Sequence, residues 1–182
     1  MDCSVLQDFV AFAPLQKEII EDYRTKVPDD IIGLWNQYGL GNFKNGFIKI
    51  INPQIFVDIL DTAYSRSNVS IPLFATGMGD IITWEDNHTF MLVNFGRKVL
   101  RGLANDVDVL FLSITSDNFC ISRMFGKNYF EAVEKYGGLA YDECFGYVPL
   151  LGLGGPEKIE NLQKVKIREQ ILVITHLLGP FQ

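Results

Sequence analysis

The first third of the chain places apolar residues at the spacing of an amphipathic α-helix. Between Pro28 and Gly39, the residues Ile31, Leu34 and Trp35 recur three and four positions apart, so they share one face of a helix. A proline at the start and a glycine just past the end are typical helix boundaries. The pattern predicts helices over 14–26, 28–39 and 53–64, with a short strand over 46–53.

The middle of the chain changes to short apolar runs separated by Gly, Asn and Asp. The runs are IPLFATG, DIITW, TFMLVNF and VDVLFLSIT, and they lie between Ile71 and Thr115. Such runs are typical of β-strands, and GMGD and WEDNHTF suit tight turns between them. We therefore expect an antiparallel meander of about four or five strands, to which 46–53 adds at one edge.

The last third returns to helical patterns at two places. NYFEAVEKYGG (128–138) places Phe130 and Val133 on one face and ends on two glycines, which favour a helix C-terminus. NLQKVKI (161–167) alternates as a strand does, and REQILVITHLLG (168–179) has the period of a helix. The sequence thus predicts an α+β fold, an antiparallel sheet of about five or six strands with helices at the N- and C-terminal ends.

Charge is unevenly distributed along the chain. The net charge is −6, and residues 1–120 contain 15 acids and 9 bases, whereas 121–182 contain 7 of each. The only basic run is Lys164, Lys166 and Arg168, so direct binding of nucleic acid is not expected. The acidity suits a basic protein partner, although the same net charge also serves solubility.

The cysteines and the N-terminus point to a reducing compartment. Cys3, Cys120 and Cys144 are odd in number and have no second Cys or His at ligand spacing, so neither disulfides nor a zinc site are expected. The chain has an acid at Asp2, and no apolar run reaches the roughly 18 residues of a membrane span. We expect a cytoplasmic protein with no membrane association, no metal and no cofactor.

Asp142 and Glu143, in the stretch GLAYDECFGYVPLLGLGG (138–155), are the first candidates for chemistry. An active site, a phosphate-binding loop and an architectural corner are each compatible with these residue types. Neighbouring acids in an extended segment point in opposite directions, whereas acid–base catalysis needs two carboxyls in one cleft. We expect both acids to fasten a tight corner, with Asp142 accepting buried amide hydrogens. The aromatics of this corner that we expect in the core are Tyr141, Phe145 and Tyr147.

The other candidates for catalysis or ligand binding have weaker patterns. The run LGLGGP lacks the spacing and the Lys-Ser/Thr end of a phosphate-binding loop. His88 and His176 have no second ligand at metal-binding spacing, and Cys144 has no histidine near it in the sequence. A small-ligand-binding or hydrolytic domain with a pocket around Asp142 and Glu143 stays open as the alternative function, because catalytic partners need not be close in sequence.

Three blocks of the sequence carry a family likeness. They are VPDDIIGLWNQYGLGNFKNGFIKIINP, IPLFATGMGDIITWE, and YGGLAYDECFGYVPLLGLGG with its continuation KVKIREQIL. In this order they resemble bacterial proteins with a GAD-like domain followed by the small domain of type VI secretion immunity proteins. By this resemblance, 1–104 is the GAD-like region and 105–182 the immunity-protein C-terminal region of one folded unit. A looser likeness to the SUKH superfamily of immunity proteins is compatible with a SUKH-like architecture.

The resemblance implies a non-enzymatic immunity protein that binds and neutralises a cognate secreted toxin in the cytoplasm, with a basic nuclease as the candidate toxin class. No catalytic residue comes with such a family. It assigns a structural role to Trp35, Gly39, Pro53, Asp142, Glu143, Gly146, Pro149, Gly154 and Gly155. Turns of a meander are exposed, and acids and aromatics there suit a basic partner. The expected partner contacts are Asp80, Trp84, Glu85, Asp86, Asp106 and Asp108.

Overall fold

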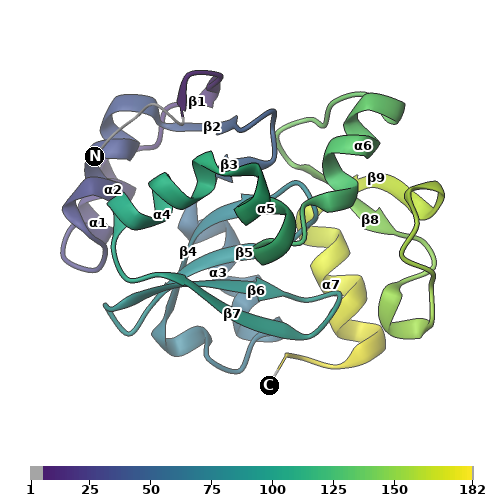
Figure 1. Cartoon of the computed structure of the whole chain (residues 1–182). Coiled ribbons are helices and arrows are strands. Elements are labelled where there is room, and N and C mark those ends of the chain that lie inside the picture. Colours follow the sequence, from purple (N-terminus) through teal and green to yellow (C-terminus); the bar gives the residue numbers. More distant parts are fainter. Residues whose placement is uncertain (1–5, 182) are drawn as a thin grey trace.

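Seven antiparallel strands form the centre of the computed structural model, which describes residues 6–181 (Figure 1). Their order along the sheet is the order of the sequence, so the sheet is a meander. It has one strand more than the upper end of the range predicted from the sequence. The strands are β1 (Val10–Ala13), β2 (Leu40–Phe43), β3 (Ile48–Ile50), β4 (Ser70–Thr76), β5 (Ile81–Glu85), β6 (Thr89–Asn94) and β7 (Val99–Ala104).

Helices lie between the first strands and after the last one, which confirms the predicted α+β class. Two helices separate β1 from β2, and one separates β3 from β4. They are α1 (Lys17–Tyr23), α2 (Asp29–Tyr38) and α3 (Pro53–Ala63). After the sheet come α4 (Val107–Thr115), α5 (Asp117–Arg123), α6 (Lys127–Tyr136) and α7 (Ile167–Leu178). A second, two-stranded sheet pairs β8 (Glu143–Tyr147) with β9 (Leu162–Lys166).

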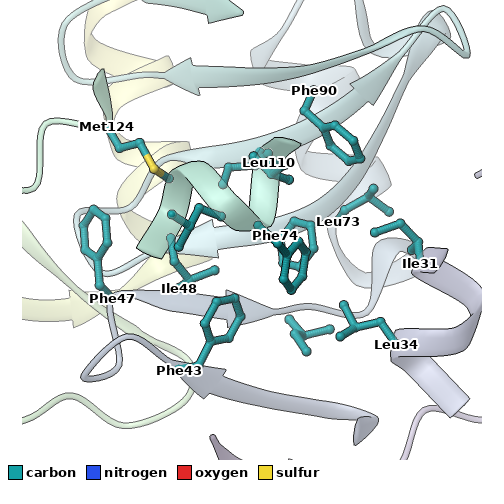
Figure 2. Packing of buried hydrophobic residues seen from close by; sticks show 14 of the residues in the cluster. Ile31, Leu34, Phe43, Phe47, Ile48, Leu73, Phe74, Phe90, Leu110 and Met124 are labelled. Atoms are coloured by element: carbon teal, nitrogen blue, oxygen red, sulfur yellow. The ribbon is translucent and has the colours of Figure 1, made fainter. Parts of the chain in front are cut away.

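The sheet lies between two hydrophobic clusters. Figure 2 shows part of the larger cluster, in which Ile31 and Leu34 of α2 and Leu110 of α4 surround Phe74 of β4. The smaller cluster covers the other face with α3 and α7. Within β5, Ile82 belongs to the larger cluster and Ile81 to the smaller, as the two-residue period of a strand requires. Burial on both faces explains why the central strands are continuous apolar runs.

One predicted strand is wrong, because VDVLFLSIT forms α4. Its apolar positions fit a strand, yet Leu110, Phe111 and Ile114 are buried at helical spacing. The deciding residue is Asp106, whose Oδ1 accepts a hydrogen bond of 2.7 Å from the Val109 amide and so caps the helix. The last strand of the meander is instead β7, whose mixed sequence VLRGLA has a weak strand signal.

The stretch 138–155 is more regular than the expected corner, since five of its 18 residues form β8 and pair with β9. Phe145 and Tyr147 are buried in the larger cluster, as expected, and Tyr141 is partly buried against it. After the cis bond to Pro149 the chain turns back on itself. A side chain at Gly155 would collide with the Pro149 carbonyl, so this close approach of two backbones needs glycine.

Candidate functional site

An apolar groove of about 670 Å³ lies beside the β1 end of the sheet. Its walls come from β1, β2, α3, the segment before β8, and the first turns of α7. We call it the edge groove and define it by Phe12, Ile55, Phe56, Tyr141, Ile167 and Leu172. Phe12 is 61% exposed, Ile55 50% and Leu172 41%. Large apolar side chains that gather at one exposed hollow are typical of a binding surface.

The segment before β8 is fastened to the sheet under this groove. The Tyr141 hydroxyl donates a hydrogen bond of 2.6 Å to the Ile50 carbonyl at the end of β3. Its ring stacks on Phe12 of β1, with 4.1 Å between the ring centroids. The Lys49 Nζ donates a hydrogen bond of 3.0 Å to the Ala140 carbonyl. Residues from the first third and the last third of the chain therefore build the groove together.

Lys49 is a fully buried lysine beside the groove floor. Burial disfavours its charged form and lowers its pKa to about 8, while nearby Cys144, Asp142 and Glu143 partly offset this effect. Near neutral pH the side chain keeps most of its charge, at a cost that the single hydrogen bond to Ala140 offsets only in part.

The rim of the edge groove carries two acids, Asp142 and Glu169, and two bases, Lys166 and Arg168. Lys166 pairs with Asp142 at 2.8 Å, and both guanidinium Nη atoms of Arg168 donate to Asp58, at 3.1 and 2.9 Å. Each rim cation is thus neutralised within the protein. Glu169 is exposed, and in the part of the chain that the structure describes it has no ion-pair partner.

Asp142 and Glu143 have different partners in the structure. The Asp142 side chain is 62% exposed and pairs with Lys166, and this hydrogen bond lowers its pKa. The principal partner of the Asp142 carboxylate is thus a lysine at the surface. Glu143 fastens the segment instead, because its Oε2 accepts a bond of 2.9 Å from the Ala140 amide.

Cys144 is poorly suited to act as the nucleophile of a hydrolase. It is fully buried, and burial raises the pKa of its thiol far above the ordinary value. The thiolate is the reactive form of a cysteine. In this conformation the sulfur is therefore a protonated core group.

Three of the six expected partner contacts are buried, which contradicts the exposure on which they were chosen. Asp80 is 3% exposed, Trp84 7% and Glu85 1%. Burial raises the pKa of Asp80 to about 8, an effect that Arg97 partly offsets. Trp84 packs against Phe90, with ring centroids 4.6 Å apart.

The buried Glu85 carboxylate is the centre of a hydrogen-bond network. It accepts from the Tyr64 hydroxyl at 2.9 Å, the Thr83 hydroxyl at 2.9 Å and Arg66 Nε at 3.0 Å. A buried carboxylate needs such donors. Its role is thus structural in this fold, because sheet pleating turns the last residue of β5 inward rather than into the turn.

The other three expected contacts are exposed. Asp86 pairs with Arg66 at 2.8 Å, and Asp106 is the cap of α4 described above. Asp108 lies in the first turn of α4. Partner contacts at these three acids stay a prediction.

The residues with an expected structural role occupy distinct positions. Trp35 is buried, Pro53 opens α3, and Gly39 ends α2 with a positive φ of 65°. Gly154 has a φ of 84°, and Gly146 lies so close to Gln170 that a side chain there would collide with it. His88 and His176 are exposed.

Residues 6–181 contain neither a metal-binding cluster nor a membrane-spanning helix. No group of three or more His, Cys, Asp or Glu residues is arranged to hold a metal ion. No helix in this range is long and apolar enough to cross a membrane.

The sequence analysis did not identify the edge groove. Ile55 and Leu172 stand next to the buried faces of their helices, where an extra apolar residue is easily counted as core. The strand VAFA is too short for a clear alternation. The signal that was available is the absence of any charged residue from the strand.

The chain is similar to two family models and to a solved structure. The model of the GAD-like domain matches residues 5–95, half of the chain. The model of the type VI secretion system (T6SS) immunity protein Tdi1, C-terminal, matches 104–178. The crystal structure of Atu4351 from Agrobacterium tumefaciens has a TM-score of 0.74 and 17% identity, over 93% of this chain and 86% of that one. At this identity the likeness shows the fold. No curated protein matched.

Proposed function

The chain belongs to the GAD-like domain family, and we propose that it is a non-enzymatic immunity protein that binds and neutralises a cognate secreted toxin in the cytoplasm. The observation that carries the proposal is the match of residues 104–178 to a T6SS immunity protein, which supports an immunity function. We propose a basic protein as the toxin, and a nuclease as its class, because residues 1–120 hold 15 acids against 9 bases. Opposite charge speeds the encounter of two proteins.

We further propose that the regions 1–104 and 105–182 act as one folded unit. The larger hydrophobic cluster supports this, because it joins side chains of both regions. Phe43 of β2 stacks on Phe111 of α4, with ring centroids 6.0 Å apart. A binding surface that spans both regions, such as the edge groove, then has fixed geometry.

The proposal is tested by expressing the gene next to that of this chain, with and without this chain, in a sensitive bacterium. We expect the neighbouring product alone to stop growth, co-expression to restore growth, and affinity purification to recover a stoichiometric complex. Growth of unprotected cells that express the neighbour, or rescue without any complex, would count against a binding immunity protein.

A small-ligand-binding domain is the second candidate, and the edge groove is the observation in its favour. Its volume of about 670 Å³ lies within the range of small-molecule sites, and Asp142 is on its rim. The apolar lining suits a hydrophobic ligand rather than hydrolysis. Retention of a small apolar molecule by the purified native protein, detected by mass spectrometry after denaturation, would favour this candidate.

A further inference from the structure

We propose that an extended strand of the toxin adds to the free edge of β1 and places side chains in the edge groove and in a second hollow beside β1. This inference rests on the proposed function and names the surface that performs it. The expected partner segment has apolar residues at every second position and a basic residue beside them.

The outer edge of β1 is available for pairing. Among residues 6–181 β1 pairs with β2 alone, and all four residues of its sequence VAFA are exposed or partly exposed. Such an edge offers a row of backbone donors and acceptors to another strand. The register shifts between Ala11 and Ala13, so Phe12 has no paired residue in β2. Its backbone is thus not committed to the existing ladder.

Two hollows receive the side chains of an added strand. Phe12 lines the edge groove and also a second hollow of about 460 Å³, whose other walls include Ala11, Ala13 and the C-terminal turn of α2 with Trp35. Successive side chains of a strand point to opposite faces. In recognition by strand addition, the backbone supplies affinity and pockets for alternate side chains supply specificity.

Each hollow has one polar group nearby without a partner in the described part of the chain, Trp35 at the second hollow and Glu169 at the edge groove. The Trp35 Nε1 is a buried donor without an acceptor in the described part of the chain, and Trp35 lines the second hollow. At the edge groove, Glu169 is the rim carboxylate with no ion pair among residues 6–181, so it suits a Lys or Arg of the toxin.

The test uses matched pairs of substitutions on the same helices. Ile55→Glu on α3 and Leu172→Glu on α7 place a charge in the edge groove. Val57→Glu and Val173→Glu place the same charge on exposed positions of these helices, 39% and 47% exposed, that do not line it. We expect the groove variants to weaken binding to the neighbouring gene product by about tenfold or more and the controls to change it by less than about twofold. Thermal unfolding of all four shows whether each variant is folded.

Hydrogen exchange tests the strand addition itself. We expect the amides of Val10–Ala13 to exchange more slowly when the toxin is bound, while the amides of β7 keep their exchange rates. Phe12→Pro removes an amide from the edge, so it is expected to weaken binding more than Phe12→Leu does. Unchanged exchange in β1, together with wild-type affinity of both groove variants, would overturn the inference.

These outcomes separate the inference from the proposed function. If wild-type protein binds the toxin and rescues growth while every groove and edge variant does the same, the proposed function stands and the surface is wrong.

Loss of binding on Asp108→Asn, while the groove variants still bind, would assign the contact to the acidic turns instead. If β1 is protected in the free protein in proportion to its concentration, a second copy of the chain is the occupant and the inference fails. If the wild type neither binds nor rescues, the proposed function fails first.

Discussion

The two outer strands of the main sheet differ in what covers them. At β7, Arg123 donates a hydrogen bond of 3.2 Å to the Gly102 carbonyl. The Arg101 Nη1 atom donates to the carbonyls of Ser122 and Arg123, both at 2.9 Å, so the end of α5 lies along this edge (Figure 1). At β1 the sequence VAFA contains no charged residue, and within residues 6–181 no second strand pairs with it.

Charged side chains on an edge strand prevent pairing with other chains. The β7 edge has this protection and β1 does not, although both edges belong to one sheet and face the same solvent. An unprotected edge carries a risk of aggregation, so it is expected where pairing is useful. The difference therefore indicates which edge a partner strand can join.

The largest expected effect is a pH dependence of stability at Lys49, the buried lysine beside the edge groove. In the folded protein its pKa is lowered from 10.5 to about 8. The unfolded state therefore binds more protons between these two pH values, and stability rises with pH through this window. In Lys49→Met this contribution is absent. The unfolding free energy of the variant minus that of the wild type is expected to fall by about 2 to 3 kcal/mol from pH 7.5 to pH 10.5.

Urea unfolding of both proteins across this pH range measures the difference, and groups that titrate alike in the two proteins cancel. A constant difference would mean that Lys49 is not desolvated. The surroundings of Lys49 would then be more open to water than the structure indicates.

Arg101→Ala tests the cover of β7. The substitution removes two hydrogen bonds to carbonyls and the contact of the guanidinium with the Phe125 ring, 4.6 Å from its centroid. We expect a loss of about 1 to 2 kcal/mol in thermal or urea unfolding. The matched control is Arg168→Ala at the groove rim, where an exposed ion pair with Asp58 and a longer contact with the Phe56 ring, 5.9 Å from its centroid, are together worth about 0.5 kcal/mol. Equal losses would show that the two edges are fastened alike.

Phe12→Ser separates binding from stability on the open edge. Phe12 is 61% exposed and its main contact is the ring of Tyr141, so we expect the unfolding free energy to fall by about 1 kcal/mol or less. Toxin binding is expected to fall by far more, since aromatic anchors dominate interface energy. Thermal unfolding and titration of the same sample measure both. A large loss of stability would make Phe12 a core residue.

Most of the fold could be predicted from the spacing of hydrophobic residues. The helices α2, α3 and α7 and the strands β4, β5 and β6 have long or well-bounded patterns, and each was predicted. The short strands β1, β2 and β8 were not, because their four or five residues hold too little periodicity, and β7 was missed because its sequence is mixed. The helix α4 was misread since VDVLFLSIT fits both periods, and only the cap at Asp106 distinguishes them.

Less of the candidate site than of the fold could be predicted from the sequence. The edge groove joins Phe12, Ile55, Tyr141 and Leu172, which are far apart in the sequence, and their meeting is set by tertiary packing. The acids were visible, but their burial was not: whether Glu85 points into the core or into the turn depends on the strand register. A one-residue change of register moves a side chain to the other face.

Asp142→Asn is expected to have the smallest effect on stability of these substitutions, and it tests the rim of the edge groove beside β1. Because the Asp142 carboxylate is exposed and its main partner is Lys166, its loss is expected to cost about 0.5 kcal/mol or less. Glu143→Gln is the matched variant, and it is expected to cost about 1 kcal/mol because the Ala140 amide loses a charged acceptor. Urea unfolding of both variants measures the order. If Asp142→Asn is the more destabilising, Asp142 holds buried amides after all, and the rim is a structural corner rather than a surface left free for a partner.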